Sequence, residues 1–124
     1  MKFLVLIYPN QERLDALPEH EFASTMRACL AHADELKRRG KLLDTQMLEP
    51  APTAKTLRKQ SGKLVVSDGP FTETKEVLGG FNLIEADTMD DALEIAAGFP
   101  WSEFGSVEVR PVLPLENMRS RVQA

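Results

Sequence analysis

The chain has too few cysteines for an intrachain disulfide, because Cys29 is the only one among its 124 residues. It also lacks a long hydrophobic run: the apolar segment from Phe3 to Tyr8 is too short to span a membrane, and no small-residue cleavage site follows it. Positively charged residues are fewer than negatively charged ones, with 15 Lys and Arg against 19 Asp and Glu. These absences predict a cytoplasmic protein that binds neither membranes nor nucleic acid.

Motifs for cofactors are missing as well. The sequence contains no Walker loop, dinucleotide fingerprint, nucleophile elbow or zinc knuckle. Its two histidines, His20 and His32, lie twelve residues apart without a nearby pattern of cysteines or carboxylates. We therefore predict neither a bound cofactor nor a metal ion.

The remaining composition is that of an ordinary globular domain, with 43% hydrophobic and 27% charged residues. A chain of this length buries about two-thirds of its unfolded surface, which is enough to fold without a disulfide or metal. No internal repeat or long linker divides it. We predict one domain over residues 1–114 and a C-terminal tail, with a short helix, over residues 115–124.

The hydrophobic pattern predicts alternating strands and helices. An apolar stripe and acidic residues at its start indicate a helix that ends before Gly40, and Thr88 is a suitable N-cap for a second helix. The expected helices are 19–39 and 89–98. The expected strands are 3–8, 42–48, 54–59, 63–67, 81–86 and 107–112, the third and fourth forming a hairpin around Gly62.

The resulting order is β-α-β, an inserted hairpin, and β-α-β. Two such units predict an α+β fold with a ferredoxin-like sheet and both helices on one face. The first strand is apolar on both faces, so the other face also needs a cover. A second subunit packed sheet to sheet would supply it, which predicts a homodimer.

One motif identifies a family. Residues 68–76 read Asp-Gly-Pro-Phe-Thr-Glu-Thr-Lys-Glu, and residues 78–81 read Leu-Gly-Gly-Phe. Together with residues 83–86, 90–93, Pro100 and 105–112, they resemble the DGPF branch of the YCII-related proteins. The resemblance implies a dimeric α+β barrel of ferredoxin-like halves. Members are mostly uncharacterised, and some relatives occur beside or fused to alternative sigma factors, which implies a functional link to such a factor.

The wider family is similar to small barrel isomerases and oxygenases. Some YCII members carry a histidine in the first helix and an aspartate just before the proline that follows the second helix. In this sequence Cys29 stands near the histidine position and Phe99 at the aspartate position. The acid–base pair of those members is therefore absent here.

Three residues are candidates for proton transfer. Asp68 fits a turn, because aspartate accepts backbone N–H bonds there, and it would equally suit the mouth of a cavity. Glu76 is the best placed acid of its loop, since Val77 and Leu78 beside it would exclude water. His32 has a suitable intrinsic pKa, although a partly buried structural histidine is the simpler interpretation.

A second group of residues would contact a ligand. Glu73 and Lys75 either form a solvated, mutually paired loop or line a pocket beside the glycine pair that opens the next strand. Arg110 shares one strand face with Glu108 and would anchor an anion if that face lined the dimer interior. The predicted ligand-binding residues are Arg110, Glu73, Lys75, Phe71 and Gly80.

Two functions follow from these candidates. The first is a homodimeric module that binds an unknown small molecule or regulates a partner without catalysis. The alternative is a cofactor-independent enzyme of the barrel isomerase or oxygenase kind, which would use a carboxylate or histidine as acid and base.

Overall fold

The computed structural model describes residues 1–72 and 74–123 of the chain. It confirms the expected order of elements and adds a short helix after the first strand. The strands are β1 (Lys2–Pro9), β2 (Leu42–Met47), β3 (Lys55–Gln60), β4 (Lys63–Asp68), β5 (Gly80–Glu85) and β6 (Gly105–Pro111). The helices are α1 (Gln11–Asp15), α2 (Glu19–Arg38), α3 (Met89–Ala97) and α4 (Leu115–Gln123), with 3-10 turns at Ala51–Thr53 and Pro100–Glu103.

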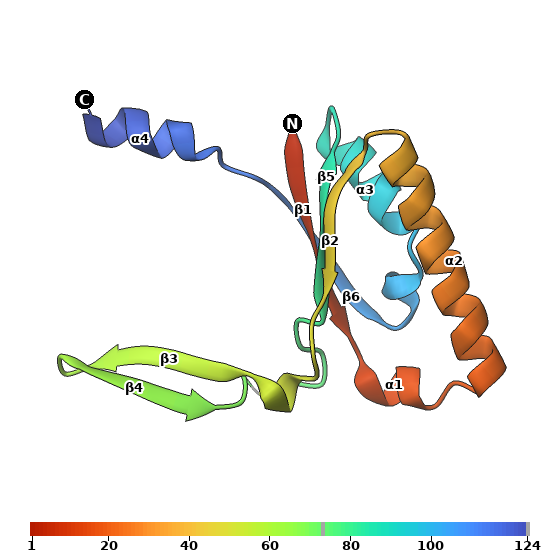
Figure 1. Ribbon diagram of the computed structural model, residues 1–124, viewed down its shortest axis with the longest axis horizontal. Helices are drawn as coiled ribbons and strands as arrows, with labels where there is room; N and C mark the ends of the chain where they lie inside the picture. The colour runs from red at the N-terminus through yellow and green to blue at the C-terminus, as the bar shows by residue number, and fades with distance from the viewer. Residues whose placement is uncertain (73, 124) are drawn as a thin grey trace.

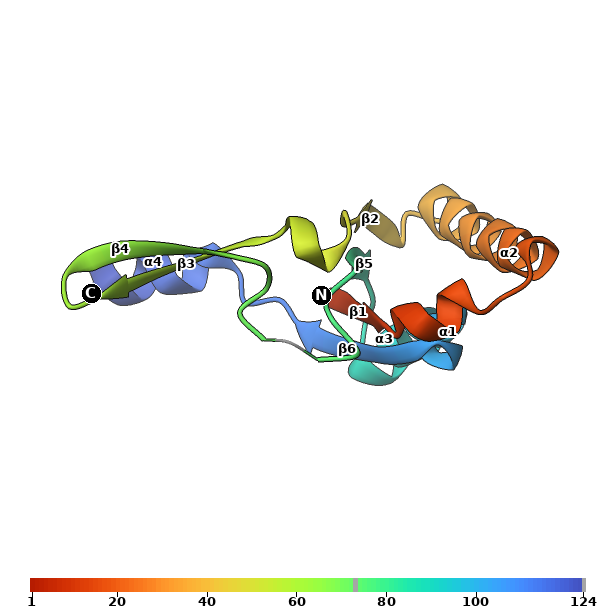
Figure 2. The same cartoon turned by 90° about the horizontal axis from the view of Figure 1, so that it is seen from below.

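The main sheet has four antiparallel strands in the order β2-β5-β1-β6, the ferredoxin-like arrangement that the sequence predicts. Helices α2 and α3 lie on one face of this sheet (Figure 1). The β3–β4 hairpin forms a separate two-stranded sheet. It projects with α4 on the opposite side, away from the helices (Figures 1 and 2).

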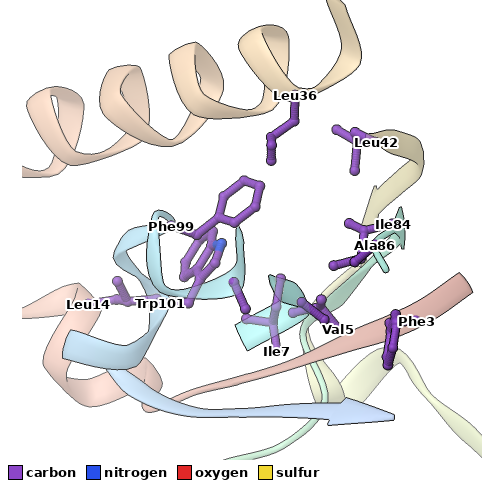
Figure 3. Packing of buried hydrophobic residues seen from close by; sticks show 12 residues of the cluster. Phe3, Val5, Ile7, Leu14, Leu36, Leu42, Ile84, Ala86, Phe99 and Trp101 are labelled. Atoms are coloured by element: carbon purple, nitrogen blue, oxygen red, sulfur yellow. The ribbon is translucent and has the colours of Figure 1, made fainter. Parts of the chain in front are cut away.

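The hydrophobic core lies between the sheet and the helices. Phe3, Val5 and Ile7 alternate along β1 and are each only 1% exposed, because successive strand residues point to opposite faces. Leu36 of α2 and the aromatic rings of Phe99 and Trp101 cover them from the helix side (Figure 3). Burying one such side chain stabilises the fold by about 1.5–3 kcal/mol.

The opposite face of the sheet is also apolar at its centre. Leu4 pairs with Leu83, and Leu6 pairs with Phe81, so these four side chains form one patch. All four are only partly buried, and no described helix covers them (Figure 1). We call this surface the open face. It is the second apolar face of β1, for which the sequence predicts a cover by another subunit.

Local signals explain where several elements begin and end. The Thr88 hydroxyl accepts a hydrogen bond from the Asp91 amide at 3.1 Å and caps α3. Gly40, with a φ of +71°, follows the end of α2. The hairpin turns at Ser61 and Gly62, whose φ angles of +50° and +78° match the twist of two antiparallel strands.

Two absences hold for the described part of the chain. None of its helices is both long and apolar enough to cross a bilayer. Within the same residues, no group of three or more His, Cys, Asp or Glu side chains is placed to hold a metal ion.

Candidate ligand-binding groove

A groove of about 660 Å³ lies where the hairpin joins the main sheet. The end of β1, the segment between β2 and β3, and the segment after β4 form its walls. Most of the lining is apolar. The residues that line it are Tyr8, Leu48, Glu49, Ala51, Thr53, Ala54, Lys55, Thr56, Pro70, Phe71, Thr72, Thr74, Glu76, Val77 and Leu78. Its size and its few polar groups are typical of a small-molecule site.

Glu76 supplies the acid of this groove. It forms a single β-bridge with Asn10, which fixes its backbone beside the end of β1. Its Oε1 atom is shielded from solvent and has no hydrogen-bond partner among the described residues. Val77 and Leu78 line the same groove, as the sequence predicts. An unpaired, buried carboxylate oxygen costs free energy that a donor from a ligand would recover.

Tyr8 links the groove to charged residues on the open face. Its hydroxyl donates to Glu108 Oε1 at 3.3 Å, and Arg110 Nε donates to Glu108 Oε2 at 2.9 Å. Partial burial raises the pKa of Tyr8 above its usual value, and the Glu108 carboxylate raises it further, while Arg110 opposes this. Tyr8 therefore remains a neutral phenol at physiological pH, able to exchange a hydrogen bond with a ligand.

Asp68 occupies the end of the hairpin rather than the groove. Its side chain is 86% exposed and forms an ion pair with Lys55 on the neighbouring strand. Gly69 follows with a φ of +85°, and its amide donates to the Ala54 carbonyl at 2.7 Å. Thr56 Oγ1 donates to the Gly69 carbonyl at 2.8 Å. These contacts account for the Asp-Gly-Pro sequence as a bend at the base of the hairpin, where β4 ends and the chain leaves the two-stranded sheet.

The other predicted ligand residues take different positions. Phe71 lines the groove, with 76% of its surface exposed. Lys75 is exposed and does not line the groove. Gly80 is buried in β5, where a Cβ would lie 2.8 Å from the Gln46 carbonyl oxygen, so its small size serves strand packing. Glu73 lies outside the described residues.

His32 lies on the helix side of the sheet. Its Nε2 atom is 3.0 Å from the Ile95 carbonyl oxygen, and its ring packs edge-on against Phe99 with centroids 4.5 Å apart. Cys29 is half-buried on the same helix, and burial raises the pKa of its thiol. The structure therefore brings Glu76 and Phe71 together in one groove and connects Arg110 to it through Glu108 and Tyr8. It does not bring His32 or the exposed Asp68 carboxylate to Glu76.

The sequence interpretation missed Tyr8 and Glu49 as groove residues. The signal for Tyr8 was present, because period-two alternation places it on the same face as Leu4 and Leu6, away from the core. Glu49 lies in a proline-rich segment, and its sequence predicts only that the preceding strand ends there. Nothing in its local pattern indicates that this segment folds back towards residues 70–72 and 74–78.

Comparisons with known proteins agree with this architecture. The sequence model of the YCII-related domain family matches residues 1–116 of this chain. An uncharacterised protein of Rhizobium meliloti strain 1021 is 38% identical over 114 residues, which are 90% of this chain and 92% of that protein. Among solved structures, the 5-chloro-2-hydroxyhydroquinone dehydrochlorinase TftG of Burkholderia phenoliruptrix AC1100, in complex with 2,5-dihydroxybenzoquinone, matches with a TM-score of 0.56. The match covers 94% of this chain and 98% of that one at 19% identity, and it shows the shared fold alone.

Proposed function

The chain belongs to the family of YCII-related domain proteins, and from this premise we propose that it is a homodimeric module that binds a small molecule in the groove. The observation that carries the proposal is the unpaired Oε1 of Glu76 in the wall of a largely apolar groove. Buried polar atoms without partners are rare in folded proteins, so this one calls for an explanation, and a donor from a bound ligand would supply it.

The charges of the groove define the class of ligand. Among the lining residues that the structure describes, Glu49 and Glu76 contribute carboxylates, and the one cation, Lys55, is already paired with Asp68. An anion would be repelled by both carboxylates, so we expect a neutral or cationic molecule. It would present a hydroxyl or amine donor to Glu76 and an apolar ring or chain to Leu48, Phe71 and Leu78. TftG, which has the same fold, binds a small hydroxylated ring, and this supports the size of the ligand.

The open face supports the homodimer. Leu4, Leu6, Phe81 and Leu83 form an apolar patch, and Glu108 and Arg110 border it. A second copy stacked about 10 Å away would bury this patch, as in other packed sheets. Because the patch would face itself across a two-fold axis, the contact is self-complementary.

A cofactor-independent enzyme is the second candidate. Glu76 would accept a proton from the bound molecule, and the Tyr8 hydroxyl, turned from Glu108 towards the ligand, would donate a hydrogen bond to the developing negative charge. The observation in its favour is that the unpaired carboxylate and the neutral phenol line one apolar groove. Against it, Cys29 stands near the position where some family members carry a histidine, and Phe99 stands where those members carry an aspartate. We therefore place binding first and catalysis second.

A thermal-shift screen tests the proposal. Matched sets of small phenols, amines and carboxylates would be compared on the wild-type protein and on Glu76→Gln, with Asp68→Asn as the control outside the groove. Saturation at 100 times the dissociation constant stabilises a fold by about 2.7 kcal/mol, a readily measured shift. We expect phenol or amine hits that disappear in Glu76→Gln only. Hits confined to carboxylates, or retained in Glu76→Gln, would contradict the groove assignment. Turnover of a hit, followed by NMR, would favour the enzyme.

A further inference from the structure

The β3–β4 hairpin is a positively charged arm on an acidic protein. It carries Lys55, Arg58, Lys59 and Lys63, whereas the whole chain has a net charge of −4. Lys55 is paired with Asp68 at the base of the arm. The other three cations form no ion pair with any residue that the structure describes, and all are exposed. We call this hairpin the basic arm.

The basic arm also carries an unpartnered apolar face. Leu57 pairs with Val66 across the two strands, and Leu64 pairs with Lys59 beside them, so these side chains share one face. Leu57, Leu64 and Val66 are 62%, 66% and 60% exposed. A two-stranded hairpin is marginally stable alone in water, and exposed apolar patches of this kind mark interaction surfaces.

An oppositely charged surface lies where α1 meets α2. Glu12 and Asp15 of α1 and Glu19 and Glu21 of α2 are all exposed and form no ion pair with a described residue. Arg13, the cation among them, donates instead to the backbone carbonyl of Glu103. We call these four carboxylates the acidic corner. A helix start explains one or two acidic residues, but four together leave a negative surface without a partner.

The topology places the arm and the corner at the same end of the sheet. Strands β1 and β2 are each antiparallel to β5, so they run in parallel and finish at one end. The corner follows β1, and the arm follows β2. Figures 1 and 2 show the arm projecting from the open-face side and α1 and α2 on the helix side. One subunit therefore cannot bring its own arm and corner together.

We propose that the basic arm of one subunit clasps the acidic corner of a second copy, reciprocally across a two-fold axis parallel to the strands. A six-residue strand is about 20 Å long, and the partner's sheet would lie about 10 Å from the open face. The arm is therefore long enough to pass that sheet and bring its turn end to the helix layer beyond it. Lys59 and Lys63 lie at this end, on opposite faces of the hairpin. The inference rests on the proposed homodimer and adds the contacts that specify it.

Charge reversal in the full-length protein tests the clasp. Variant one carries Lys59→Glu and Lys63→Glu, variant two carries Glu19→Lys and Glu21→Lys, and variant three combines all four changes. The control reverses two cations elsewhere on α2, Arg27→Glu and Lys37→Glu. Sedimentation velocity gives the oligomeric state, and subunit exchange between fluorescently labelled copies gives the dissociation rate at low and high salt.

We expect variants one and two to dissociate roughly tenfold faster than wild type, because each sets like charges against each other. Variant three should return towards the wild-type dissociation rate, since it restores opposite charges. The control variant should dissociate at the wild-type rate. A dimer whose exchange rate is the same in all variants would overturn the clasp and leave the homodimer intact. A wild-type protein that sediments as a monomer would overturn both. Circular dichroism of each variant separates loss of contact from loss of folding.

Discussion

His32 lies directly over Gly98, so that a Cβ at that glycine would be 2.3 Å from His32 Nε2. Because Nε2 is also 3.0 Å from the Ile95 carbonyl oxygen, which only accepts hydrogen bonds, this nitrogen carries the proton and donates it. The histidine thus joins the middle of α2 to the last turn of α3. This role is structural, whatever further role His32 has.

Substitutions at this contact should show strong coupling. Gly98→Ala should destabilise the fold by about 1–3 kcal/mol, because the new methyl group collides with the imidazole. His32→Ala should cost a similar amount through loss of the hydrogen bond. The double variant should cost less than the sum, since removing the ring removes the collision. Urea denaturation of the four proteins measures this, and additive costs would contradict the contact.

Tyr8 gives a direct readout of the polar chain beside the groove, because it is the only tyrosine in the sequence. Its ionisation can be followed by ultraviolet absorbance without interference from other phenols. Its pKa should lie above the usual value of 10.0, and Glu108→Gln should lower it without returning it fully, since burial remains. Glu85→Gln, at the far end of the sheet, is the control that should leave the titration unchanged.

The raised pKa of Tyr8 also predicts how stability depends on pH. The folded state holds the phenolic proton more tightly than the unfolded state, so this contribution is complete below the unfolded pKa of about 10. It is lost as the pH rises from there through the folded pKa. Tyr8→Phe should remove this part of the alkaline decline in the free energy of unfolding. An unchanged decline would contradict the shift.

Glu76→Gln should separate stability from binding. Replacing this carboxylate by a neutral amide should raise the free energy of unfolding by roughly 1 kcal/mol, because shielding one oxygen from water costs more for a carboxylate than for an amide. The same change should abolish binding of phenol or amine ligands. Glu49→Gln is the matched control, since it removes an exposed carboxylate from the same groove and should leave stability unchanged. A less stable Glu76→Gln protein would mean that this carboxylate serves the fold.

The Asp-Gly-Pro turn should behave as backbone architecture. Gly69 has a φ of +85° with open space where a Cβ would stand, so Gly69→Ala should cost about 1 kcal/mol through backbone strain alone. Asp68→Asn should cost less than about 1 kcal/mol, because its ion pair with Lys55 is exposed. Chemical denaturation gives both values. Loss of ligand binding in Asp68→Asn, with the fold intact, would instead restore Asp68 as a functional acid.

The fold was predictable because local signals agreed with each other. A continuous run of apolar residues identifies β1, the Thr88 cap begins α3, and Gly62 marks the hairpin turn. The short helix α1 was missed, since its five residues carry a single buried apolar side chain, Leu14, and Asn10 appeared only to end a strand. The apolar positions of α2 differ in their burial, which the sequence does not show: Leu36 is buried, but Leu30 is 63% exposed. Periodicity shows which residues share a face, and it does not show how far the sheet extends beneath them.

The groove was predictable only in part. The family motif contains Glu76 and Phe71, which the sequence predicts as site residues, and both line the groove. Tyr8 and Glu49 lie 60 and 19 residues before the start of that motif at Asp68. Their meeting in the groove depends on the register between β1, β5 and β2. His32 was singled out for its intrinsic pKa, a property that carries no information about which side of the sheet it occupies. Long-range placement of this kind is decided by packing, which a single sequence does not display.

The open face provides the last prediction. Leu6 and Phe81 are direct partners at its centre, flanked by Leu4 and Leu83, and each is only partly buried in one subunit. Leu6→Asp would place a charge in the middle of a sheet-to-sheet contact, where desolvation without a partner costs several kcal/mol. We expect this variant to be a folded monomer at concentrations where the wild type is a dimer. Ser106→Asp, an exposed position on the same face at the sheet edge, is the matched control and should remain dimeric. Analytical ultracentrifugation distinguishes the two states, and a Leu6→Asp protein that stays dimeric would move the subunit contact to another surface.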